Sequence, residues 1–100
     1  MRRRNWLVED NLVALYIALH KYKDLRYELK KIKRIIPHKG FPMRIQNYIA
    51  IDTDGRKGLD AALESPLFNE LYGIFKDFRQ KKFARLVNSI LDVKLKVNKR

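Results

Sequence analysis

The chain has 100 residues, 46% of them hydrophobic, with only 4 Gly and 3 Pro, which suits one folded domain and excludes a disordered or fibrous protein. Its 23 basic residues against 11 acidic ones give a net charge of +12, which indicates a polyanionic partner. The absence of cysteine excludes disulfides and cysteine-ligated zinc.

The positive charge is concentrated at the two ends of the sequence. Residues 1–44 contribute +8, residues 45–80 contribute −2 and residues 81–100 contribute +6. We expect both ends to belong to one polyanion-binding surface. No secretory signal follows the basic start, and the longest apolar run, residues 12–19, is shorter than the roughly 20 residues of a membrane span. These features predict a soluble, intracellular, cytoplasmic protein.

The first predicted helix starts after Asn5 as its cap, with Glu9 and Asp10 near its positive end. Apolar residues at 12, 14, 15 and 17–19 cover most of its circumference and predict a central position in the fold. The preceding basic arm, residues 1–4, carries three arginines where the helix dipole disfavours cations. These arginines suit a phosphate backbone or a minor groove, although a solvated terminus explains them equally well.

The second predicted helix begins after Asp24 and ends before Pro37. Its apolar residues recur at steps of four, three and four along one face, namely Leu25, Leu29, Ile32 and Ile36. The rest of its surface is basic. Lysines and arginines in such numbers suit phosphate contacts, and a solvated charged face is the alternative.

A third helix is predicted from about Phe41, with Pro42 in its first turn, after a short turn that contains an exposed His38 and Gly40. One face carries Phe41, Ile45, Tyr48 and Ile49, and the opposite face carries Met43, Gln46, Asn47 and Ala50. Two helices joined by a tight glycine-containing turn are typical of a helix-turn-helix. Arg44, Gln46 and Asn47 would suit base edges in a major groove, but they are also consistent with solvent-facing or locally bonded residues.

A fourth helix is predicted to start with Ser65 as cap and Pro66 at its first position, and to bury Leu67, Leu71, Ile74, Phe75 and Phe78. A second apolar stripe follows, which lies roughly 140° around the helix axis from the first. We therefore expect the helix to break near Gln80 or to present its end to another partner, including a second copy of the chain. That stripe consists of Phe83, Leu86, Val87, Ile90 and Leu91. The whole chain reads as one all-α domain of four to five helices, with a core over residues 5–92 and a basic tail over residues 93–100.

No catalytic or metal-binding motif is recognisable. The DTDG segment at residues 52–55 resembles part of a calcium-binding loop, but that alignment puts Ala50 and Ala61 where carboxylates are required. The histidines, His20 and His38, lack ligand partners at metal spacing. We expect no enzyme activity and no cofactor.

From Asn5 to about residue 80, the chain resembles the small N-terminal domain that precedes the HNH nuclease domain in many restriction endonucleases. The resemblance rests on Asn5-Trp6 with Glu9 and Asp10, on MRIQNYIAID (residues 43–52), on Gly58-Leu59 and on LYGIFKDF (residues 71–78). It implies a helical DNA-recognition domain that delivers a nuclease or reads modified bases, with residues 47–63 as the connector between the recognition helix and the last helices. The chain departs from that pattern at Leu7 and Val8, where a Thr or Ser cap is more typical, and it lacks the HNH motif itself, so catalysis is not implied.

Two classes of function remain open. The first is a double-stranded DNA-binding protein of a virus, a mobile element or a restriction-modification system. Its candidate DNA-binding residues are Arg2, Arg3, Arg4, Lys30, Lys31, Lys33, Arg34, His38, Lys39, Met43, Arg44, Gln46 and Asn47. The second is an interaction module that dimerises through the stripe from Phe83 to Leu91. RNA binding is a third and weaker alternative.

Overall fold

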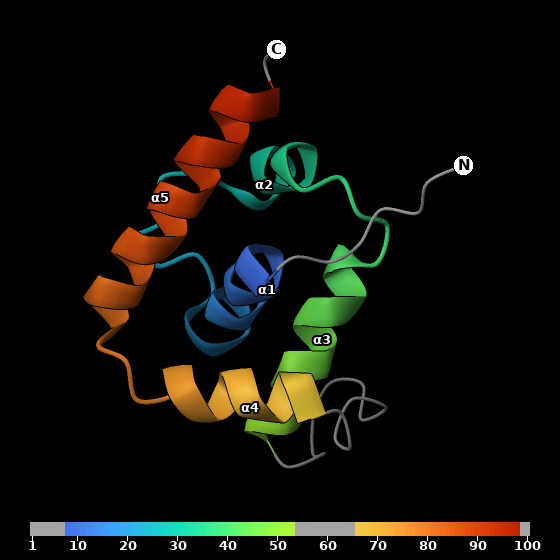
Figure 1. Cartoon of the computed structure of the whole chain (residues 1–100), viewed down its shortest axis with the longest axis vertical. Helices are drawn as coiled ribbons and strands as arrows, with labels where there is room; N and C mark the ends of the chain where they lie inside the picture. The colour runs from blue at the N-terminus through green and yellow to red at the C-terminus, as the bar shows by residue number, and fades with distance from the viewer. Residues whose placement is uncertain (1–7, 54–65, 99–100) are drawn as a thin grey trace.

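The computed structural model describes residues 8–53 and 66–98, which form five helices and no strand. The helices are α1 (Val8–His20), α2 (Leu29–Ile35), α3 (Phe41–Asp52), α4 (Pro66–Phe75) and α5 (Gln80–Asn98). Helix α1 lies in the centre, and the other four surround it (Figure 1). The predicted all-α class with four to five helices is confirmed.

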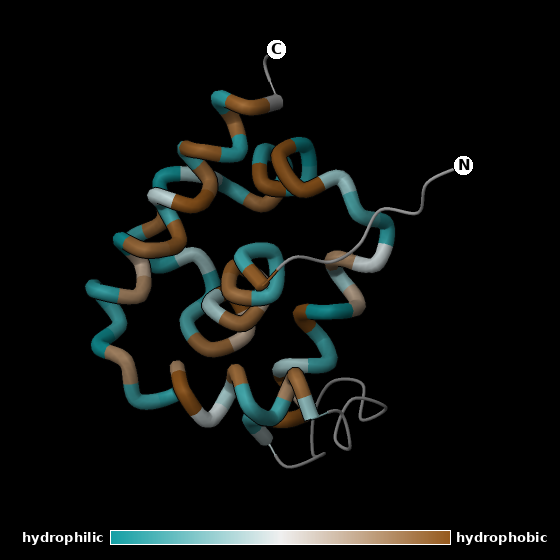
Figure 2. Tube along the Cα trace, viewed as in Figure 1, coloured by the Kyte–Doolittle hydropathy of each residue, from teal (hydrophilic) through white to brown (hydrophobic). Residues whose placement is uncertain are grey.

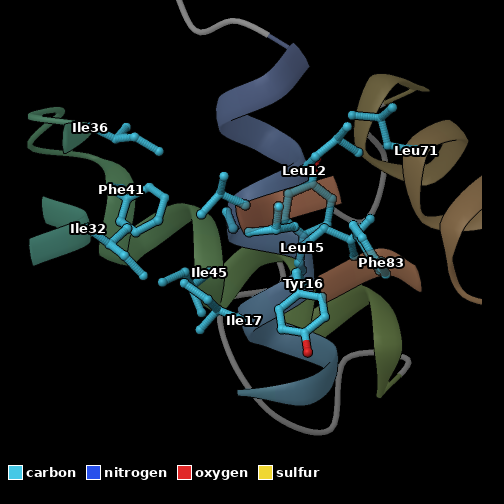
Figure 3. Packing of buried hydrophobic residues seen from close by; sticks show 14 of the residues in the cluster. Leu12, Leu15, Tyr16, Ile17, Ile32, Ile36, Phe41, Ile45, Leu71 and Phe83 are labelled. Carbon is cyan, nitrogen blue, oxygen red and sulfur yellow. The ribbon is translucent and has the colours of Figure 1, made fainter. Parts of the chain in front are cut away.

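The core forms around α1 because apolar residues cover most of the circumference of this helix. All its residues from Asp10 to Ile17 are buried, and Val13, Ala14, Leu15 and Tyr16 have no exposed surface. Side chains from the other helices close over it in a single apolar cluster (Figure 3). The prediction that the first helix is central is therefore confirmed, whereas its cap, Asn5, lies outside the described residues.

Helix α2 begins at Leu29, so the predicted start after Asp24 is wrong. Glu28, directly ahead of the helix, is extended with φ −89° and ψ 168°, and Lys21 and Asp24 have positive φ values of 58° and 60°. Instead, residues 21–28 form an irregular connection that is bonded to α5. The Asn88 side chain donates to the carbonyl of Asp24 (3.0 Å) and accepts from the backbone N–H of Arg26 (2.9 Å).

The main helix contacts pair α1 with α3, α1 with α5, α3 with α4, and α2 with α5. The two helices of the predicted helix-turn-helix are present on either side of residues 36–40. Each of them packs mainly on a different helix, α2 on α5 and α3 on α1. Their relative position therefore depends on the whole core.

Helix α4 starts at Pro66, as predicted, but its buried face differs from the predicted one. Leu67 and Ile74 are 44% and 55% exposed, whereas Phe68 and Leu71 are buried. The ring of Phe68 packs on the ring of Tyr48, with 4.9 Å between their centroids, and this contact turns Phe68 towards α3.

The predicted break near Gln80 is confirmed, because α4 ends at Phe75 and α5 starts at Gln80. Residues 93–98 are not a tail but the last turns of α5. They remain helical because Leu95 packs against the core and the Lys94 ammonium lies 2.9 Å from the Asp10 carboxylate.

Candidate nucleic-acid interface

The exposed side of α2 is basic because the helix is anchored by isoleucines on its other side. Ile32 and Ile35 are buried in the core. Lys30, Lys33 and Arg34 therefore point towards solvent, while Lys31 is half-buried. The helix contains no acidic residue. Within residues 8–53 and 66–98, none of these four cations forms an ion pair.

The turn after α2 extends this basic surface towards α3. Lys39 is exposed, and an open depression of about 300 Å³ is lined by Lys33, Pro37, His38, Lys39 and Pro42. Pro37 and Pro42 keep this connection short, because one disfavours continuation of α2 and the other suits the first turn of α3. Two exposed lysines, Lys33 and Lys39, thus line the same depression as Pro42 in the first turn of α3.

The outer side of α3 presents part of the predicted recognition face. Met43 is 57% exposed and Gln46 is exposed, whereas Asn47 is half-buried and Ala50 is buried. Met43 and Gln46 are therefore the two candidate base-contacting residues that the structure leaves open to solvent.

Arg44 does not belong to that exposed face, which corrects its predicted placement. Its guanidinium lies 4.8 Å from the centre of the Phe68 ring and donates to the Asn11 side-chain oxygen over 3.3 Å. The Tyr48 hydroxyl donates to the same oxygen over 3.1 Å. Burial lowers the pKa of Arg44 and raises that of Tyr48. Arg44 therefore links α3 to α1 and α4.

His38 is also placed differently from the prediction of an exposed turn residue. Only 11% of its side chain is exposed, and its Nε2 lies 4.0 Å from a carboxylate oxygen of Asp10, which is itself buried. The other oxygen of Asp10 lies 2.9 Å from the Lys94 ammonium. These three side chains join α1, the α2–α3 turn and α5, so His38 positions the turn instead of facing solvent.

Several predicted features lie partly or wholly outside the described residues. These are the Asn5 cap, the arginines at positions 2–4, the Ser65 cap and the part of the predicted connector that follows Thr53. The last residue of α3 is Asp52, whose carboxylate accepts a hydrogen bond of 2.9 Å from the Tyr72 hydroxyl. Asp52 thereby ties the end of α3 to α4.

The second apolar stripe of α5 belongs mainly to the core, so most of the residues predicted to mediate dimerisation are buried within the protein itself. Phe83, Val87 and Leu91 have no exposed surface. Leu86 is 37% exposed and Ile90 is half-buried, so only these two of the five predicted dimer residues are available to a partner.

A group of basic residues at the start of α5 was not among the predicted site residues. Arg79, Lys81, Lys82 and Arg85 are all exposed. Four cations within seven residues are visible in the sequence itself. The signal in the sequence is the density of these cations, whereas the apolar stripe of the same helix indicates only which side is buried.

The described part of the chain contains no cluster of three metal-ligating side chains and no helix long and apolar enough to cross a membrane. His20 lies against the rings of Tyr16 and Phe83, and burial lowers its pKa. Comparisons of the chain with protein-family models, with curated proteins and with solved structures give no match.

Proposed function

We propose that this protein binds double-stranded DNA through α2, the turn that follows it and the outer side of α3. The observation that carries this proposal is the continuity of exposed cations with exposed candidate base-reading groups. Lys30, Lys33 and Arg34 lead through the depression beside Lys39 to Met43 and Gln46. The proposal includes the intracellular location predicted from the sequence and the restriction-related role implied by the resemblance to targeting domains of HNH nucleases, with no cleavage by this chain.

The two parts of this surface would act differently on DNA. The ammonium and guanidinium groups of α2 bind phosphates, which releases counterions and is independent of base sequence. Gln46 carries an amide that pairs bidentately with the major-groove edge of adenine, and Met43 offers an apolar contact for the methyl group of thymine. His38 and Arg44 support this surface from inside, through Asp10 and Asn11 respectively.

The proposal is tested by fluorescence anisotropy with a random duplex of roughly 25 base pairs over a range of salt concentrations. Replacing Lys30 and Lys33 by Gln is expected to weaken binding similarly for all sequences and to reduce the salt slope by about one per lost contact. The matched control is K21Q/K96Q, which removes two charges from exposed lysines elsewhere. Equal salt slopes for K30Q/K33Q and the unmodified protein would show that α2 does not contact the DNA.

Base reading and the type of nucleic acid need a separate measurement. Q46A is expected to change the preference among duplexes more than the affinity for any one random duplex, because glutamine reads base edges. A matched single-stranded RNA serves as competitor. Tighter binding to that RNA than to the duplex would favour the RNA alternative.

A second candidate function, homodimerisation through α5, is favoured by one observation. Leu86, Ile90, Val93 and Val97 follow one another at steps of four, three and four residues, and Val93 and Val97 are 60% and 61% exposed. Apolar residues at this spacing form the contact seam of paired helices. Hydrophobic positions accordingly continue along α5 to its end (Figure 2).

The predicted effect of L86D is a change in oligomeric state without loss of DNA affinity, measured by analytical ultracentrifugation and anisotropy. The matched control is I74D, which places the same charge at an exposed apolar position of α4, outside the stripe. A monomeric unmodified protein at micromolar concentrations would exclude a stable homodimer.

A further inference from the structure

A second concentration of positive charge surrounds the start of α5, outside the surface proposed above. Five basic residues lie within ten positions of the chain, and Asp77 is the one acidic residue among them. The basic residues, all of them exposed, are Lys76, Arg79, Lys81, Lys82 and Arg85. Four of these, together with Gln80, line an open depression of about 590 Å³. Figure 2 shows the hydrophilic character of this part of the chain.

Contacts within the protein do not account for these charges. Lys76 and Lys82 lie 5.8 Å from the rings of Tyr72 and Phe78, respectively, which stabilises an exposed cation only weakly. None of the five forms an ion pair within the described ranges. The carboxylate of Asp24, which is close to the depression, accepts a hydrogen bond of 2.9 Å from Gln80. The cations therefore repel one another in the free protein.

The α5 cluster is separated from the basic surface of α2. The start of α5 follows the end of α4, whereas α2 lies beside the later part of α5 (Figure 1). Asp92, whose carboxylate binds Arg26 just ahead of α2, comes thirteen positions after Arg79. At 1.5 Å per residue this corresponds to about 20 Å along the helix. The two groups of cations thus form distinct surfaces.

We infer that the basic depression at the start of α5 is a second nucleic-acid contact, which binds a stretch of phosphate backbone. Several exposed cations spread over an open depression match the repeated charges of a polynucleotide strand, whereas a single small anion is usually held by convergent, enclosed donors. This inference rests on the proposed function and extends it to another surface. The role of each surface can be refuted independently of the other.

The experiment compares two variants that lose the same number of charges. R79Q/K81Q/R85Q removes three cations of the depression and retains the contact of Lys82 with Phe78, while K30Q/K33Q/R34Q removes three cations of α2. All six positions are exposed. Circular dichroism and thermal unfolding confirm the fold, and anisotropy with a duplex of roughly 25 base pairs gives the salt slope. We expect the slope of R79Q/K81Q/R85Q to fall by about two to three, about one per lost phosphate contact.

Acetylation of lysines in the unmodified protein, followed by mass spectrometry, locates the contacts. A reduced slope for R79Q/K81Q/R85Q, together with duplex-dependent protection of Lys81 and Lys82, supports the second surface. An unchanged slope overturns it, and so does a reduced slope without that protection, because the latter shows only an effect of net charge. Protection of Lys30 and Lys33, and the slope of the α2 variant, report separately on the proposed function.

Discussion

The side chain of Asn88 holds the connection between α1 and α2 in place, and its removal is expected to destabilise the protein. Asn88 is 6% exposed and lies on α5, yet it bonds two backbone groups more than 60 residues away in the sequence. The amide donates to the carbonyl of Asp24 over 3.0 Å and accepts from the N–H of Arg26 over 2.9 Å. Asn88→Ala removes both bonds and supplies no replacement for either partner.

The expected loss follows from the cost of leaving partly buried backbone groups unbonded. Removing one partner of a buried hydrogen bond costs about 1–3 kcal/mol, and Arg26 and Asp24 each lose a bond. We expect N88A to lower the free energy of unfolding by about 2–4 kcal/mol. For a domain of about 100 residues this corresponds to a decrease in Tm of roughly 8–20 °C.

The assay is urea and thermal unfolding followed by circular dichroism, with S89A as the matched control. Ser89 is the next residue of α5 and is exposed, so S89A is expected to change stability by less than about 0.5 kcal/mol. Hydrogen exchange of the Arg26 amide provides a local readout, because this amide loses its acceptor in N88A. Equal stability of the two variants, with unchanged Arg26 exchange, would refute a role for Asn88 in holding this connection.

Three further predictions concern the other interior polar groups. K94Q is expected to lower the free energy of unfolding in urea by about 1–3 kcal/mol, because it removes the ammonium that lies 2.9 Å from the buried Asp10 carboxylate. The control is K96Q at an exposed position, and an equal loss of stability in the two variants would contradict the prediction. Burial lowers the pKa of His20 below its usual 6.5, so the unfolded state takes up the proton first as the pH falls through 6.5 and below. The free energy of unfolding of the unmodified protein should therefore decrease from pH 7 to pH 5 more steeply than that of H20Q. The same pH dependence in both proteins would show that His20 does not cause this decrease. R44M should lower Tm, because Asn11 loses a hydrogen-bond donor and the Phe68 ring loses its cation. The salt slope of DNA binding should not change, and a lower slope would indicate that Arg44 contacts DNA.

Local sequence patterns are sufficient to predict the helical class and several helix ends. Prolines account for the starts of α3 and α4 and the end of α2, since proline lacks the donor that a helix interior requires. The rotation between two apolar stripes predicted the break before Gln80, because one straight helix cannot turn both stripes towards one core. The exposure of Lys30, Lys33 and Arg34 followed from the spacing of the isoleucines that α2 buries.

Which polar groups face inwards depends on contacts between helices that are distant in the sequence. The path of residues 21–28 depends on Asn88, and the positions of His38 and Arg44 depend on Asp10 and Asn11 of α1. Local patterns carry no information about such partners, because these residues are far apart in the sequence and meet only after the helices pack. Likewise, α4 is apolar on more than one side, so the contact of Phe68 with Tyr48, and not helical periodicity, selects its buried face.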